Sequence, residues 1–225
     1  MWLAAWRIRD IFPVSYGRLY VLPLLSGFSE AYPDITLDLS FDDAYVDMIE
    51  HGVDVSIRSG TLDDSCLVAK QLSPIDFLIC ASMDYSERHG PITRHNLMQH
   101  PWIRFRFKQT GRPMPIMMRD GQAQVNLDPG NQNIVDDGEA LADLCAQGLG
   151  LTQMSHFITR DWIRQKKIRP VFLYFRPKGF GVWVIYAKRD YLPARIKAFV
   201  GFLERAIQDI GESAYHTWAE HLTID

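Results

Sequence analysis

Strand-like and helix-like segments alternate through the first 60 residues, and this alternation limits the possible folds more than any other feature of the sequence. Apolar and polar side chains alternate at residues 6–12, 35–41 and 53–57, which is typical of strands. Helical spacing over residues 22–28 and a short helix predicted over residues 45–50 separate these strands. This order predicts a largely parallel sheet, which places ligand-binding loops at the carboxyl ends of its strands.

The loops after these strands are the first candidate binding segments: residues 13–17, 42–44 and 58–60. Ser15 can either cap the following helix or present its hydroxyl to a bound carboxylate, and the sequence leaves both roles open. Arg58 is the one basic residue among ten acidic residues between positions 30 and 64. We therefore expect Arg58 to be paired or to be available to an anion.

The rest of the chain repeats the mixed pattern and predicts a second α/β lobe. Strands are expected at residues 66–72, 77–81, 102–107, 116–118, 125–127, 151–154 and 180–188. Helices are expected at residues 138–147, 155–166 and 194–210, and a turn-rich segment at residues 83–91, after a lobe boundary near residue 82. The last helix carries an apolar stripe, which we expect to pack against the first lobe.

The charge is small in sum but unevenly distributed. Lys plus Arg number 24 and Asp plus Glu 27, giving a formal net charge of −3, the opposite of the basic footprint of a nucleic-acid-binding domain. Residues 88–119 nevertheless contain seven basic and no acidic side chains. This asymmetry can steer an anionic ligand, can orient two protomers, or can reflect ordinary solvated surfaces.

The sequence contains no nucleophile elbow, Walker loop, dinucleotide-binding loop or HExxH motif. The cysteines Cys66, Cys80 and Cys145 lack the paired spacing of a zinc site or a disulfide framework. No apolar run reaches the roughly 18 residues of a membrane span, and no secretory signal is recognisable. We therefore predict a cytoplasmic protein that is not an enzyme and that uses no cofactor and no metal.

The segment Asp136-Asp137-Gly138-Glu139 is a further candidate site, because a helix is expected to begin there. Either aspartate is a suitable N-cap, with acidic help in the first turn. The N–H groups of that turn can alternatively bind an anion if they face a cleft. The sequence favours capping without excluding the second role.

A set of short segments occurs in order over about residues 7–208: Pro13-Val14-Ser15-Tyr16-Gly17-Arg18, Leu22-Pro23-Leu24-Leu25, Tyr32-Pro33-Asp34-Ile35, residues 46–58 (VDMIEHGVDVSIR), Leu67-Val68-Ala69, Asp137-Gly138-Glu139-Ala140-Leu141, Gly148-Leu149-Gly150 and Leu192-Pro193. No single segment is specific, but the ordered set resembles the effector-binding domain of LysR-type transcriptional regulators. The resemblance implies an α/β fold of the type 2 periplasmic-binding-protein kind, with two Rossmann-like lobes joined by a two-strand hinge.

The resemblance also implies boundaries and a binding site. Lobe one is expected to comprise residues 7–81 plus 188–210, lobe two residues 82–187, and a C-terminal tail residues 211–225. An effector would bind between the lobes, and the family's pocket positions fall on these residues: Ser15, Asp42, Arg58, Phe105, Arg106, Asp137, Gly138 and Glu139. Tyr16 joins Phe105 as a flat apolar contact. The chain departs from the family at Asp76, where a basic residue is usual, and at Ala81-Ser82-Met83, where Ala-Ser-Pro is usual.

The family's winged helix-turn-helix and linker helix precede the first strand, whereas about six residues do so here. We therefore expect DNA contact only through a helix-turn-helix domain absent from this chain, assembly as a homodimer or homotetramer, and no membrane partner. The effector is expected to be a small anionic or aromatic molecule, because Arg58, Arg106 and two helix starts favour anions. The alternative is a stand-alone cytoplasmic solute-binding protein or an enzyme on the same bilobed fold.

Overall fold

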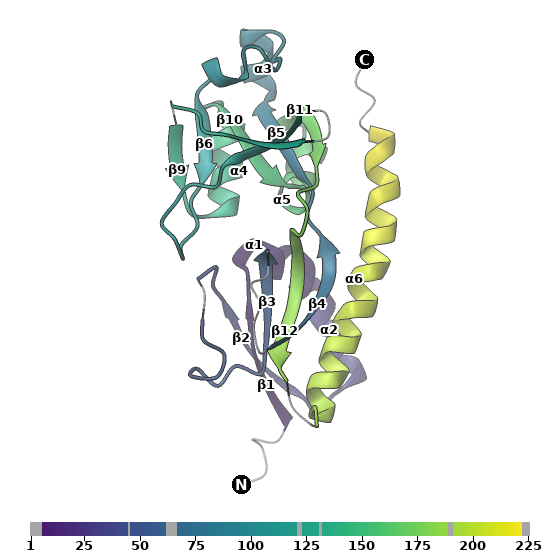
Figure 1. The fold of residues 1–225 in the computed structure, drawn as a ribbon. Helices are drawn as coiled ribbons and strands as arrows, with labels where there is room; N and C mark the ends of the chain where they lie inside the picture. The colour runs from purple at the N-terminus through teal and green to yellow at the C-terminus, as the bar shows by residue number, and fades with distance from the viewer. Residues whose placement is uncertain are drawn as a thin grey trace. The chain divides into compact units, whose positions relative to one another are not determined.

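The computed structural model describes residues 6–44, 46–61, 67–120, 123–130, 132–188 and 191–221. The chain divides into two compact units (Figure 1). Unit 1 consists of Met1–Asp42, Val46–Pro74 and Gly179–Asp225, and unit 2 consists of Asp43–Tyr45 and Ile75–Lys178. Within the ranges that the structure describes, no helix is both long enough and apolar enough to span a membrane.

Unit 1 is built on a five-stranded sheet in the order β2-β1-β3-β12-β4. Its strands are β1 (Arg7–Phe12), β2 (Thr36–Phe41), β3 (Val55–Gly60), β4 (Leu67–Pro74) and β12 (Gly181–Ala187). β1 runs parallel to β2 and to β3, as predicted, so the carboxyl ends of these strands lie at the same end of the sheet. β12 runs antiparallel to β3 and β4, which makes the sheet mixed.

Two strands belong to the opposite unit from the one expected. β12 lies within the range 82–187 expected for lobe two but pairs in unit 1, whereas all but the last residue of β5 (Phe77–Ser82) lies in the range expected for lobe one, and β5 pairs in unit 2. Both strands are almost continuously apolar, and such runs do not reveal which sheet buries them. The hydrogen-bonding partners decide: β12 pairs with β3, and β5 pairs with β10 (Leu151–Ser155).

The segment after β1 is helical throughout, in short pieces: α1 (Val14–Tyr16), the π-helical turn η2 (Gly17–Val21), the 3₁₀ turn η3 (Leu22–Leu24) and α2 (Leu25–Ala31). Gly17 is needed because a Cβ at this position would lie 2.6 Å from the Cβ of Phe12. Phe28 of α2 packs edge-on against Phe199 and Phe202, with ring centroids 5.0 and 5.4 Å away. The predicted helix therefore supplies part of the core of unit 1.

The last helix, α6 (Ala194–His221), belongs to unit 1 as expected. It packs beside β4, where Lys70 Nζ lies 3.0 Å from Glu204 Oε1 (Figure 1). The helix does not end at residue 210 but continues to His221, so the predicted separate tail is wrong up to that residue. Gly211 did not end the helix, because one glycine costs a helix only about 1 kcal/mol.

The helix predicted over residues 45–50 is also wrong, since the described residues 48–52 form turns. Asp47 Oδ1 accepts hydrogen bonds from the backbone amides of Ile49, at 2.8 Å, and Glu50, at 3.1 Å. An aspartate that bonds to the following amides offers the backbone an alternative to helix formation. Gly52, at φ +63°, then turns the chain into β3.

Unit 2 contains a second five-stranded sheet, in the order β11-β5-β10-β6-β9. Its further strands are β6 (Trp102–Phe105), β9 (Gln132–Val135) and β11 (Ile168–Phe175), and β7 (Ile116–Asp120) and β8 (Ala123–Leu127) form a separate antiparallel pair. β9 and β11 were not predicted. β9 is a four-residue edge strand with little apolar alternation, and β11 is irregular in its pairing with β5 near Pro170 and Phe172.

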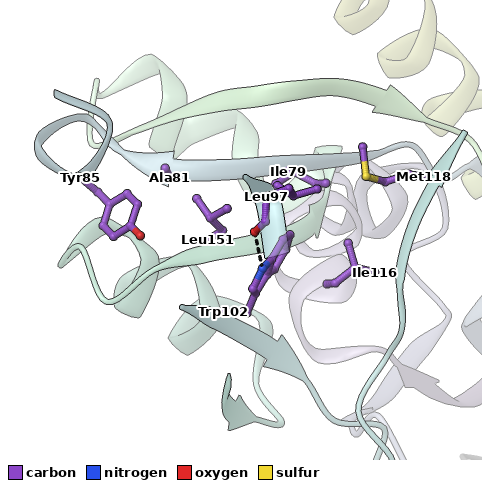
Figure 2. Close-up of a cluster of buried hydrophobic side chains, with 8 residues drawn as sticks. All are labelled: Ile79, Ala81, Tyr85, Leu97, Trp102, Ile116, Met118 and Leu151. Carbon is purple, nitrogen blue, oxygen red and sulfur yellow. Dashed lines mark hydrogen bonds between the residues drawn. The ribbon is translucent and has the colours of Figure 1, made fainter. Parts of the chain in front are cut away.

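The helices of unit 2 are α3 (Met83–His89), α4 (Gly138–Ala146) and α5 (His156–Arg164), with a 3₁₀ turn η4 (Leu97–Gln99). α3 replaces the expected turn-rich segment, because Ser82 Oγ caps it by accepting from the Tyr85 amide at 3.0 Å. Trp102 is fully buried and donates from Nε1 to the Leu97 carbonyl at 3.2 Å (Figure 2). Trp102 and Leu97 belong to an apolar cluster in unit 2, whose buried members are Ile79, Ala81, Tyr85, Leu97, Trp102, Ile116, Met118 and Leu151 (Figure 2).

Candidate functional site

The first group of candidate residues lies at the carboxyl end of β1. Pro13 ends the strand, and α1 follows at once with Ser15 and Tyr16, which are 8% and 1% exposed. The Tyr16 hydroxyl lies 3.3 Å from Ser73 Oγ, and its ring stacks on Tyr20. Burial raises the pKa of the Tyr16 phenol above its ordinary value. Tyr16 is therefore a neutral core residue in this structure, with its hydroxyl tied to β4.

Asp42 follows β2 and is joined to the neighbouring strand end. Its backbone amide donates to the Phe12 carbonyl at 2.9 Å, while the residue itself is exposed. The ends of β1 and β2 are thus brought together as the parallel pairing predicts. The carboxylate of Asp42 adds negative charge to this end of the unit 1 sheet.

Arg58 lies within β3 rather than after it, because the strand continues to Gly60. One guanidinium nitrogen, Nη2, donates to the Val46 carbonyl at 2.8 Å, and Nε lies 3.3 Å from Ser56 Oγ. Both are neutral acceptors, so these bonds orient the guanidinium without neutralising its charge. Val46, which sequence reasoning did not single out, is therefore the residue that positions Arg58.

In unit 2, Phe105 ends β6 and Arg106 follows it. The Arg106 amide donates to the Val135 carbonyl at 2.7 Å, and its Nη2 lies 2.9 Å from Asp136 Oδ2. Both side chains of this ion pair are a little under half exposed. The hydrogen bond from Arg106 lowers the pKa of the Asp136 carboxyl. Arg106 is thus already paired within unit 2. The ring of Phe105 packs edge-on against that of Phe107.

The start of α4 follows directly after Asp136. Asp137 is the N-cap, and its Oδ1 accepts from the Ala140 amide at 2.8 Å, so capping, the role favoured by the sequence, is present. Gly138 is buried, and Glu139 supplies an acidic side chain in the first turn. Three carboxylates at one helix start oppose the binding of an anion there.

The cysteines and histidines form no metal centre: within the ranges that the structure describes, no cluster of three or more His, Cys, Asp or Glu side chains could hold an ion. Cys80 and Cys145 are fully buried, and burial raises the pKa of both thiols, that of Cys145 to about 12. Cys66 lies outside the described residues. His100 is buried, with Nδ1 2.9 Å from the Tyr85 hydroxyl.

Comparison with known proteins adds the family. The sequence model of the LysR substrate binding domain matches residues 8–208, which is most of the chain. The chain belongs to this family. The resemblance noted from the ordered segments is therefore confirmed, and the LysR substrate binding domain is a regulatory domain rather than a member of an enzyme family.

Two relatives of this LysR substrate binding domain are themselves named as regulators. The HTH-type transcriptional regulator CrgA of Neisseria meningitidis is 28% identical over 193 residues, covering 85% of this chain and 62% of CrgA. The HTH-type transcriptional regulator YcaN of Escherichia coli is 24% identical over 195 residues, covering 84% of this chain and 62% of YcaN. The chain thus spans about three fifths of the length of these relatives.

Solved structures place the fold of the LysR substrate binding domain. The regulatory domain of CrgA from Neisseria meningitidis superposes with a TM-score of 0.74 at 26% identity, covering 89% of this chain and 98% of that one. The effector domain of AmpR from Pseudomonas aeruginosa gives a TM-score of 0.76 at 18% identity, covering 93% and 99%. The predicted α/β fold of the periplasmic-binding-protein type is confirmed.

Proposed function

We propose that this LysR substrate binding domain is the effector-sensing part of a DNA-binding transcriptional regulator, and that it binds its effector without turning it over. The observation that carries the proposal is the family match over residues 8–208, which includes parts of both units. DNA binding would come from a helix-turn-helix domain outside this chain, in a homodimer or homotetramer that acts in the cytoplasm. Effector binding would shift an equilibrium between two arrangements of that assembly.

The residues proposed to serve the effector are Ser15, Tyr16, Asp42 and Arg58 of unit 1 and Phe105, Arg106, Asp137, Gly138 and Glu139 of unit 2. Arg58 supports an anionic effector, because its guanidinium lies near the end of β3 and is oriented there by the Val46 carbonyl and Ser56 Oγ. Arg106 already pairs with Asp136. Phe105 supports an aromatic group, so we propose a small carboxylate with an aromatic or apolar part, whose anionic group meets Arg58 and whose other part meets Phe105 and the acidic start of α4.

A thermal-shift screen of the chain against small carboxylates, aromatic acids, amino acids and phosphorylated metabolites tests this proposal. A ligand at about 100 times its Kd should stabilise the folded chain by about 2.7 kcal/mol, a shift of about 6 °C. Arg58→Gln keeps a donor for the Val46 carbonyl but removes the charge, so it should abolish the shift. Arg169→Gln, at an exposed arginine of β11, is the matched control.

The regulatory half of the proposal is tested on the full-length protein that carries the helix-turn-helix domain. A ligand found in the screen should change its affinity for promoter DNA, and Arg58→Gln should remove that response. A ligand that binds the domain but leaves promoter binding unchanged would overturn the regulatory role, and turnover of the ligand would overturn the assignment as a non-enzyme.

A further inference from the structure

Apart from the short segment Asp43–Tyr45, unit 2 is one continuous stretch of chain, which begins between Pro74 and Ile75 and ends between Lys178 and Gly179. Asp76 stands directly before β5, and Arg176 directly after β11. β5 and β11 are antiparallel, with Phe77 opposite Phe175, so the two charged residues occupy the next position of the ladder. Both connecting segments of unit 2 therefore meet at this one pair.

The contact between Asp76 and Arg176 is bidentate. Arg176 Nε lies 2.6 Å from Asp76 Oδ1, and Arg176 Nη2 lies 2.7 Å from Asp76 Oδ2. The Asp76 side chain is 6% exposed, whereas that of Arg176 is 50% exposed. A parallel pair of charge-assisted bonds fixes the orientation of both groups. The buried carboxylate consequently depends on Arg176 more than the half-exposed guanidinium depends on Asp76.

A third element, the beginning of α5, holds the backbone of Asp76. The His156 amide donates to the Asp76 carbonyl at 2.8 Å, and the Asp76 amide donates to His156 Nδ1 at 3.2 Å. These bonds extend the antiparallel pairing of β10 with β5, which ends at Ser155 opposite Phe77. Because Nδ1 accepts, the imidazole is unprotonated at this nitrogen.

We infer that Asp76 holds both connecting segments against the beginning of α5, through its bonds to Arg176 and His156. We call these three residues the latch. Bending between the units then occurs only in residues outside the latch. On the outgoing segment, Ile75 is buried and Pro74 is still paired with Gly181. The remaining place where this segment can bend is the link between Pro74 and Ile75. On the return segment, residues 177–180 lie between Arg176 and β12, and Gly179 has a φ of +79°, with open space among the described residues where a Cβ would lie.

The latch rests on the proposed function, because an effector domain that signals needs two arrangements and a place to bend. It names Asp76 as a positioning residue rather than a ligand-binding one. The test below needs no ligand, so its failure and the failure of the effector screen are separable.

Hydrogen exchange of the unliganded chain, corrected for intrinsic rates, tests the latch at single residues. In the parent chain, the amides of Asp76 and His156 should be protected, and those of Lys178 and Gly179 should exchange faster. Arg176→Gln should raise the exchange rates of Asp76 and His156 by at least about tenfold, while α4 stays unchanged. Arg169→Gln, on the same strand, is the matched control and should change neither rate.

Two results would overturn the latch. One is an unprotected Asp76 amide in the parent chain. The other is an Arg176→Gln variant whose exchange rises equally throughout unit 2, because the ion pair would then stabilise the unit as a whole. If Arg176→Gln does not fold, Arg176→Lys serves instead: it keeps the charge but not the bidentate geometry, and a smaller rise confined to Asp76 and His156 supports the latch.

Discussion

Two aspartates, one in each unit, are almost completely buried in opposite surroundings. Asp76 of unit 2 is 4% exposed and has a bidentate arginine and two backbone hydrogen bonds. Asp10 of unit 1 is 0% exposed, and among the residues that the structure describes neither of its carboxylate oxygens has a hydrogen-bond partner. It stands in the middle of β1 on the same face as the buried Ile8 and Phe12.

The difference is in the charge state that each site stabilises. Burial raises the pKa of Asp10 well above its usual value, and the nearby Asp54 raises it further. The Ile11 amide lowers the pKa of Asp10, but it does not form a hydrogen bond of good geometry. The surroundings of Asp10 therefore favour its neutral form and its burial is a cost to unit 1, whereas Asp76 is held by its partners in unit 2. The comparison teaches that burial alone does not assign a structural role to an acid.

The largest expected change in stability comes from leaving Asp76, like Asp10, buried without a charged partner. Arg176→Leu removes the guanidinium and leaves the carboxylate buried without its ion pair. We expect a loss of about 3 kcal/mol in the free energy of unfolding of unit 2, below the upper end for a fully buried pair because Arg176 is half exposed. Urea unfolding followed by unit 2 amide resonances measures it.

The control for this prediction is the double variant Asp76→Leu/Arg176→Leu. Removing both partners takes away the buried carboxylate as well, so the double variant should be more stable than Arg176→Leu alone. If the two losses simply add, the carboxylate is not what makes the single variant unstable.

The second effect has the opposite sign and concerns Asp10. Asp10→Val replaces an unpartnered acid with an apolar residue of similar size that suits a strand, and should stabilise unit 1 by about 2 kcal/mol. Asp10→Asn keeps a buried polar group of the same shape and should give little of this gain. If the melting temperature rises for Asp10→Asn as much as for Asp10→Val, the charge of Asp10, and not its unsatisfied polar atoms, would be what destabilises unit 1.

The third prediction is the pH dependence of the Asp10→Val gain. The unfolded chain releases the Asp10 proton above a pKa of about 3.9, whereas the folded chain retains it to a higher pH. Unfolding of the parent is therefore favoured as pH rises, and the advantage of Asp10→Val should grow as the pH rises above about 4. Unfolding curves of both proteins across this range measure the difference, and an advantage that shrinks with pH would show that Asp10 is ionised in the folded state.

Much of the fold was predictable because the signals are local. The alternation in β1, β2 and β3 and the stripe of α6 are each readable within one segment, and all were confirmed. The errors arose where a distant partner or one polar contact decides the structure. β5 and β12 were assigned to the wrong lobes because pairing across the sequence selects their sheets, and Ser82 and Asp47 each decide a local structure through side-chain bonds to amides.

The candidate site was predictable as a set of positions but not as a set of charges. The ends of β1 and β2 and the α4 cap lie where the sequence places them, whereas β3 continues through Arg58 to Gly60. The pairing of Arg106 with Asp136, 30 residues away, and the contact of Arg58 with the Val46 carbonyl could not be read from spacing. Asp10 shows the same limit, because a polar residue at a buried position of a strand breaks the alternation without revealing its protonation state.

The smallest expected change in stability comes from His156, a buried titratable residue that is hydrogen-bonded to the backbone of Asp76. Burial lowers the pKa of His156, although Asp76 acts in the opposite direction. The folded chain therefore binds a proton less readily than the unfolded chain, so stability is lost as pH falls below the unfolded pKa of about 6.5. His156→Gln retains an acceptor for the Asp76 amide but cannot be protonated, and it should remove up to about 1 kcal/mol of this acid sensitivity between pH 6.5 and 5. Its matched control is His95→Gln, at an exposed histidine of the same unit, which should leave the acid sensitivity unchanged. An equal response of both variants would mean that the protonation of His156 does not affect the contact between Asp76 and Arg176.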